Sequence, residues 1–124
     1  MTEQLENRSS GLESGDAPFV REAQEPTGMA GVELFLHTYN HPQSSAPIRT
    51  SRFTIESGCR THEDRHAVSE LWLISRGTLD VAYDGRSFRV SAGQVVFFEP
   101  WKSHFTKNVG EHQAEVFSVW WTQA

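Results

Sequence analysis

TLDVAYDGRSFRV, residues 78–90, reads as two short strands joined by a tight turn at Asp84-Gly85. An Asp-Gly pair between two alternating runs is typical of a type I′ hairpin, because both central residues take positive φ. Runs of the same kind lie on both sides of it. They are VELFLHTY (32–39), SRFTIES (51–57), LWLIS (71–75), QVVFFE (94–99), HFTKN (104–108) and AEVFSVWW (114–121). About eight short strands without a helical period predict an all-β fold, a small antiparallel barrel or sandwich.

The first 27 residues differ from the rest of the chain. They are rich in Glu, Ser, Gly and Pro, and their few apolar residues show no period. Such a segment buries too little surface to offset the entropy lost on ordering. We therefore expect a flexible N-terminal arm over residues 1–27, disordered or docked on a partner, and a β-barrel domain over residues 28–124. Phe19 and Val20 are the residues of the arm that are candidates for docking.

Composition excludes several classes of function. A chain of 124 residues is long enough for one domain, and its net charge of −5 comes without a basic stripe, which argues against nucleic acid as a partner. It has no run of eighteen apolar residues and no basic, apolar leader at its N-terminus, so we expect neither a membrane span nor secretion. The single cysteine, Cys59, rules out an internal disulfide. We therefore predict a cytoplasmic protein.

Upstream of the hairpin, GCRTHEDRHAVSELWLISRG (58–77) carries imidazoles and carboxylates. On an extended strand, His62, Asp64, His66 and Glu70 share one parity and so point to one face. His104 follows a turn at Pro100 on a later strand. HEDRH alone is more often a solvated surface, but Glu70 directly precedes an apolar run, where a surface strand needs no acid. Together these residues are suited to bind zinc, iron, manganese or nickel.

These two stretches resemble the two motifs of the cupin family. His66, three residues, Glu70, six residues and Gly77 match motif one. In GQVVFFEPWKSHFTKN (93–108), the glycine, the histidine eleven residues later and the asparagine four beyond it match motif two. The resemblance covers about residues 50 to 121. It implies a double-stranded jelly roll with a divalent metal inside. With Asp and Glu among the ligands, we expect Zn²⁺ first, with Fe²⁺ or Mn²⁺ as alternatives; a barrel without metal is the remaining possibility.

Three positions depart from these motifs. Asp64 stands where motif one has its first histidine, and His62 lies two residues earlier. We favour Asp64 as the ligand, because His62 would need a local bulge. Glu99 replaces the proline of motif two and is either a pocket acid or a strand-end charge, so Glu70 and Glu99 are the catalytic candidates. Trp101 replaces a glycine, and we expect it to pack in the core.

The resemblance implies a metal-dependent enzyme acting on a small polar metabolite. SELWLISRG, FFEP and VFSVWW are similar to cupin units that use zinc to join an N-hydroxylated amino acid to another amine through a nitrogen–nitrogen bond. A dioxygenase or isomerase acting on a small acid, or a non-catalytic sensing barrel like those of arabinose-type regulators, are the alternatives. We also expect a homodimer through edge strands. One of Trp120 and Trp121 would then line the barrel, and the other would face the partner.

Overall fold

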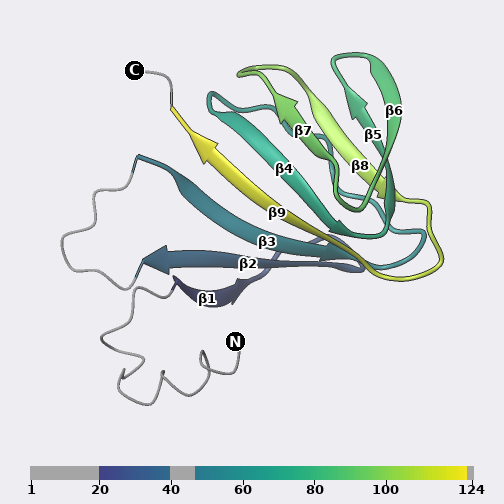
Figure 1. Ribbon diagram of the computed structural model, residues 1–124, viewed down its shortest axis with the longest axis horizontal. Coiled ribbons are helices and arrows are strands. Elements are labelled where there is room, and N and C mark those ends of the chain that lie inside the picture. The colour runs from purple at the N-terminus through teal and green to yellow at the C-terminus, as the bar shows by residue number, and fades with distance from the viewer. Residues whose placement is uncertain (1–19, 40–46, 123–124) are drawn as a thin grey trace, which may run out of the picture.

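The protein was studied as a computed structural model, which describes residues 20–39 and 47–122. In these ranges nine strands form two antiparallel sheets, one of six strands in the order β1-β2-β3-β9-β4-β7 and one of three in the order β6-β5-β8 (Figure 1). The strands are β1 (Val20–Glu25), β2 (Val32–Tyr39), β3 (Arg49–Ile55), β4 (Ser69–Arg76), β5 (Thr78–Tyr83), β6 (Arg86–Ser91), β7 (Val95–Phe98), β8 (His104–Asn108) and β9 (Ala114–Trp121).

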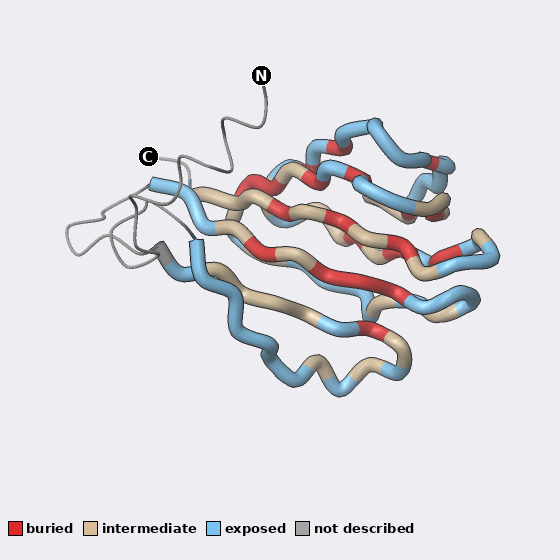
Figure 2. The backbone as a smooth tube through the Cα atoms, turned by 60° about the horizontal axis from the view of Figure 1, so that its bottom comes forward, coloured by how far each residue is buried: buried red, intermediate tan, exposed pale blue. Residues whose placement is uncertain are grey.

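The prediction of an all-β jelly roll is confirmed. The eight strands expected from alternation all form, and their ends differ from the expected ones by at most two residues. The larger sheet curves against the smaller one, and buried positions alternate along the central strands (Figure 2). The inward-facing apolar side chains make one core. Its members are Val32, Phe53, Ile55, Trp72, Ile74, Leu79, Val81, Val90, Val96, Phe98, Ala114 and Val116.

Two turns explain why particular residues stand where they do. Asp84 and Gly85 have φ of 50° and 81°, as the predicted type I′ hairpin requires. Gly77 lies where the chain leaves β4 for β5 in the other sheet, and its φ is 98°. A Cβ atom at this position would lie 2.8 Å from the Cβ of Ala114. Gly77 is therefore required both by its backbone conformation and by lack of space.

The end of the predicted N-terminal arm differs from the expectation. Residues 20–25 form β1, which pairs antiparallel with β2 over its whole length at the edge of the larger sheet. All six residues of β1 are exposed (Figure 2), so the strand has no apolar face from which it could be predicted. Residues 1–19, including Phe19, lie outside the described residues, and for them the flexible arm stays a prediction.

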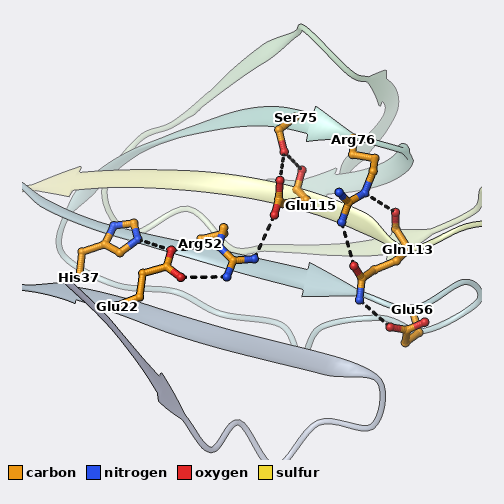
Figure 3. Close-up of polar contacts among 8 residues, drawn as sticks. All are labelled: Glu22, His37, Arg52, Glu56, Ser75, Arg76, Gln113 and Glu115. Carbon is orange, nitrogen blue, oxygen red and sulfur yellow. Dashed lines mark hydrogen bonds and ion pairs between the residues drawn. The ribbon is translucent and has the colours of Figure 1, made fainter. Parts of the chain in front are cut away.

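Side chains on the outer face of the sheet attach β1 to the body of the protein (Figure 3). The guanidinium of Arg52 on β3 donates two hydrogen bonds to the Glu22 carboxylate, at 3.0 and 2.9 Å, and a third to Glu115 on β9 at 3.0 Å. His37 on β2 lies 2.9 Å from the same Glu22 carboxylate. The Arg52 guanidinium, joined by His37, outweighs the effect of burial and lowers the pKa of Glu22 to about 2.

Replacing Arg52 with methionine should lower the free energy of unfolding at pH 7 by on the order of 1 kcal/mol, the upper range for a partly exposed ion pair. Methionine retains an apolar side chain over the ring of Phe35, which the guanidinium covers at 4.2 Å. Glu22 has a lowered pKa, so its stabilising effect is present above the ordinary value of 4.5 and is lost as the pH falls through about 2. Urea unfolding should therefore show a difference between wild type and variant that shrinks between about pH 5 and about pH 2.

The matched control is Arg52→Lys, which keeps the charge but cannot donate two parallel hydrogen bonds to Glu22. It should lose less stability than the methionine variant. A difference between wild type and Arg52→Met that stays constant with pH would contradict the assignment to the Glu22 pair.

The outer face of the larger sheet carries several exposed apolar side chains. Leu73, Val95 and Phe97 are 45%, 59% and 47% exposed, and Phe97 stacks on Trp121 with ring centroids 6.4 Å apart. Trp120, the neighbour of Trp121, lines the interior cavity instead. This is the expected division of the two tryptophans between barrel and surface. The homodimer itself stays a prediction.

Candidate metal centre

The residues between β3 and β4 are held alongside β8 by backbone hydrogen bonds. Asp64 and His104 exchange two of them, each 2.9 Å long, as a closely bonded antiparallel pair. Thr61 N–H donates to the carbonyl of Thr106 at 2.9 Å, and the carbonyl of His66 accepts from the Trp101 N–H at 2.7 Å. Because directly paired residues project to the same side of a sheet, this pairing places the Asp64 and His104 side chains together.

Four side chains converge from three places in the fold. Asp64 and His66 come from this segment, Glu70 from the start of β4 and His104 from the start of β8. Ligand atoms of Asp64, His66 and His104 all lie within 4.8 Å of one another. Glu70 Oε1 lies 3.1 Å from His66 Nε2 and 3.5 Å from His104 Nε2, and His66 Nε2 lies 3.8 Å from Asp64 Oδ2.

The four side chains of the centre differ in how far they are exposed to solvent. The side chains of His104 and Glu70 are 5% and 11% exposed, and those of His66 and Asp64 are 29% and 65% exposed. His104 is further fixed by Phe98, whose ring lies parallel to it with centroids 4.4 Å apart. A buried pair of ligands with an open side is the arrangement expected of a catalytic metal centre, since such a centre leaves a position for a ligand from solution.

The Glu70 carboxylate is oriented by its second oxygen. Oε2 accepts hydrogen bonds from Trp72 Nε1, at 2.9 Å, and from the Ser118 hydroxyl. These bonds turn Oε1 toward the two imidazoles. Burial alone raises the pKa of Glu70, but the nearby imidazole of His104 and the hydrogen bonds from Ser118 and Trp72 outweigh it and hold the pKa below its usual range. The carboxyl group is therefore held as a carboxylate, the form that binds metals.

Two buried polar atoms near this centre have no hydrogen bond within the described residues. They are Glu70 Oε1 and His66 Nδ1, and of the two it is Glu70 Oε1 that faces the imidazoles, since His66 turns its Nε2 toward the centre. Buried polar atoms without a hydrogen bond are rare, and a bound ion is one accepted reason for them. In a zinc site with bonds of about 2.1 Å, neighbouring ligand atoms lie roughly 3 to 3.5 Å apart. The distances from Glu70 Oε1 to the two histidines fall in this range, so the residues fit a divalent metal.

The structure separates the two candidates for the first ligand. His62 is exposed, lies outside the group of converging ligand atoms, and donates its backbone N–H to Met29 Sδ at 3.2 Å. Asp64 belongs to that group. Asp64 therefore lies closer to the other candidate ligands than His62 does, and its role as the first ligand stays a prediction. Segment 60–66 is joined to β8 by isolated bridges and is not a continuous strand, so parity alone did not determine which side chains meet.

The structure does not bring Glu99 to the centre. Glu99 is exposed at the end of β7, where its carboxylate accepts a hydrogen bond of 3.2 Å from the Tyr83 hydroxyl, and it does not line the cavity. Of the two interpretations, the structure agrees with the strand-end charge. The packing expected for Trp101 is wrong. Its side chain is 59% exposed, and its φ of 66° is one that glycine, the residue of the family motif, adopts without strain.

The centre opens into a cavity of about 590 Å³ between the sheets. The cavity is lined by eighteen residues from the β1–β2 turn, β2, β3, segment 61–68, β4, β8 and β9. Its size is within the range of cavities that hold small-molecule ligands. Ser118 and Trp72 were not recognised from the sequence as partners of the centre. The sequence offered one indication of this role: Ser118 and Trp72 each lie on the face of their strand that is expected to point inward.

Fold and site together define a class, a small jelly-roll barrel with a group of histidines and carboxylates inside that could hold a metal ion. The family model described as "Cupin domain" matches residues 51–120, more than half of the chain. The protein therefore belongs to the cupin domain family, as the two motifs predicted. No helix long and apolar enough to cross a membrane occurs in the described residues. The cytoplasmic location stays a prediction.

Solved structures share this fold at low sequence identity. A predicted oxalate decarboxylase from Thermotoga maritima is 19% identical with a TM-score of 0.68, over 84% of this chain and 94% of that one. An RmlC-like cupin from Shewanella frigidimarina is 16% identical with a TM-score of 0.66, over 83% and 86%. A Cupin 2 conserved barrel domain protein from Salinispora arenicola is 24% identical with a TM-score of 0.61, over 82% and 75%. At these identities the likeness shows the fold alone.

Proposed function

We propose that this cupin is a metal-dependent enzyme, with Asp64, His66, Glu70 and His104 as the ligands of one divalent ion and a small molecule bound in the adjoining cavity. The observation that carries the proposal is the convergence of Asp64, His66 and His104 beside Glu70 Oε1, a buried oxygen that has no hydrogen bond among the described residues. Two carboxylates and two imidazoles favour zinc, manganese or iron(II) over copper. Zinc remains our first choice among them.

A divalent ion at this position supplies Lewis acidity, which polarises a bound carbonyl or carboxylate and lowers the pKa of bound water. The chain's own residues have separate roles. Trp72 and Ser118 hold Glu70 in one rotamer, and Phe98 holds the ring of His104. Asp64, the most exposed of the four, stands on the solvent side of the centre. The walls of the cavity keep bulk water away from a bound molecule.

Metal analysis tests the proposal. Protein purified without chelator, or reconstituted with Zn²⁺, Mn²⁺ or Fe²⁺ under anaerobic conditions, should contain about one ion per chain. His104→Ala should lose it, and the matched control His112→Ala, which removes an exposed histidine outside the cavity, should retain it. Asp64→Asn should weaken binding more than His62→Gln does. A wild type without metal after reconstitution, or equal retention in His104→Ala, would refute the proposed centre.

The reaction that the enzyme catalyses is a separate and more specific proposal. Nitrogen–nitrogen bond formation between an N-hydroxylated amino acid and a second amine, in which the N–O bond breaks and the hydroxyl leaves as water, rests on the resemblance of three short runs, with dioxygenase and isomerase chemistry as alternatives. Incubating the zinc-loaded protein with N-hydroxylated lysine and candidate amino acids should give a hydrazine product, detectable by mass spectrometry. Recovery of unchanged substrates would count against this reaction but would not contradict the proposed metal centre. A non-catalytic sensing barrel would bind its ligand without turnover in any such assay.

A further inference from the structure

The lining of the cavity is of two chemical kinds. The proposed ligands, with His62 and Glu63 beside them, make its polar part. Much of the remaining lining is apolar or aromatic, from Met29, Val32, Leu34, Leu36, Phe53, Val68, Trp72 and Trp120, of which Trp72 and Trp120 lie next to Glu70. Among the described residues that line the cavity, none is lysine or arginine. An anionic group placed away from the metal would therefore be desolvated against apolar walls without a cation to pair with it.

Two serines make the room for a ligand body. The strand register aligns Leu36 on β2 with Ser51 on β3, Ser51 with Ser118 on β9, and Ser118 with Trp72 on β4. These four residues line the cavity as one row across the sheet. In the next row toward the core, the same strands place Leu34, Phe53, Val116 and Ile74, which pack as core or against it. Ser51 and Ser118 thus leave open a space that larger side chains fill one row away.

The charge of the centre limits the head group of the ligand. Asp64 and Glu70 contribute two negative charges that a divalent ion balances, and Glu63 adds a third, exposed charge beside them. Ser118 is already engaged with Glu70, which leaves Ser51 as the small residue on the floor of the apolar part. A ligand therefore finds one position for a metal-binding group and, beyond it, a surface that favours uncharged carbon.

We propose that the ligand of this cavity is amphipathic: one monoanionic metal-binding head, such as a carboxylate, on an uncharged alkyl or aromatic body that lies over Ser51 between Leu36, Phe53 and Trp120. This rests on the proposed metal centre and narrows its substrate class from the small polar metabolite expected from the sequence. It disfavours dianionic substrates, and it makes Ser51 a specificity-determining residue through its small size.

The test uses straight-chain monocarboxylates from acetate to octanoate, titrated by calorimetry into the metal-loaded full-length protein. Affinity should rise about three- to fourfold for each methylene buried. A dicarboxylate of the same length should bind at least about tenfold more weakly than the monocarboxylate, because its second charge is desolvated. Affinity that is flat with chain length, or dicarboxylates that bind as tightly, would overturn the inference.

Variants at Ser51 locate the effect. Ser51→Leu fills the floor of the cavity. The affinity of this variant for the monocarboxylates should therefore stop rising at a shorter alkyl chain than in the wild type, and its metal content should equal that of the wild type. Ser51→Ala is the matched control and should follow the wild-type series. Should Ser51→Leu fail to fold, Leu36→Phe narrows the same row from its other end and is expected to shorten the series likewise. Unchanged chain-length profiles in the folded variants would refute the placement over Ser51.

The outcomes separate this inference from the proposed function. A wild type that binds metal but shows no chain-length dependence defeats the inference alone. A wild type that takes up no metal defeats the proposed function and with it the metal-binding head of the ligand, and straight-chain alcohols of the same lengths then test the uncharged body alone. They should quench or shift the fluorescence of the cavity-lining Trp72 and Trp120 increasingly with chain length. The absence of such a trend would overturn the placement of that body in the cavity as well.

Discussion

Glu70→Gln should lower the affinity for Zn²⁺ by more than about 100-fold, since even the partners that merely orient metal ligands typically contribute 10- to 100-fold. The substitution replaces a buried anionic donor by a neutral amide. The remaining amide oxygen still accepts hydrogen bonds from Trp72 and Ser118, so the metal-free variant should melt close to the wild type. Competition with a fluorescent zinc chelator measures the affinity, and calorimetric unfolding of the metal-free proteins checks the fold.

Two further variants serve as controls for the zinc affinity of Glu70→Gln. Glu63→Gln removes the same charge from the same cavity, but the Glu63 carboxylate is exposed and accepts a hydrogen bond from Ser103. It should change the zinc affinity by no more than about threefold, because solvent screens an exposed charge. Ser118→Ala removes one hydrogen bond that orients Glu70 and should cost about tenfold. Equal losses for Glu63→Gln and Glu70→Gln would mean that general electrostatics, and not ligation, binds the ion.

Asn108→Ala should lower the free energy of unfolding by about 3 kcal/mol or more, with a fall in Tm of about 10 °C. Asn108, the asparagine of the second motif, is fully buried. Its Nδ2 donates to the carbonyls of Ile55 and His112, both at 2.8 Å, and its Oδ1 accepts from Gly110 N–H at 2.9 Å. The variant leaves these backbone groups without their partner, and each such buried group costs about 1 to 3 kcal/mol.

A second side-chain amide in the same turn serves as the control. Gln113 is half-buried, donates to Glu56 and accepts from Arg76 (Figure 3), so Gln113→Ala should cost less than about 1 kcal/mol. Asn108→Asp keeps the acceptor but sets a carboxylate against two carbonyl oxygens, and it should also be strongly destabilised. Urea unfolding at pH 7 measures all three. An Asn108→Ala protein as stable as Gln113→Ala would show that this motif position has a role other than holding the fold.

Each of the two motifs thus contains residues with structural roles and residues that form the candidate metal centre. Gly77 and Asn108 keep the backbone in place, through a crowded turn and through buried hydrogen bonds. His66, Glu70 and His104 form the centre. Motif spacing alone cannot separate these duties, because it records only which residues recur and not what their side chains touch. The contacts supply the distinction.

Some features of the structure could not be predicted from any local pattern in the sequence. Strand β1 (VREAQE) has every residue exposed, so it lacks the alternation by which the other strands were predicted. It is held by backbone pairing with β2 and by the contact of Glu22 with Arg52, thirty positions away. Glu99 was ambiguous for a similar reason. Whether an acid at a strand end faces the cavity depends on how the following turn is oriented, and here it faces Tyr83.

By itself the sequence determined that this protein is an all-β cupin, where eight of the nine described strands lie and which histidines and carboxylates are candidate ligands. Alternation, turn residues and motif spacing are all local properties, readable within one segment. Tertiary structure decided that Asp64 rather than His62 pairs with His104, that Ser118 and Trp72 orient Glu70, and that Ser51 lines the cavity. These facts depend on the register between strands far apart in the chain, and register emerges only when the whole sheet is assembled.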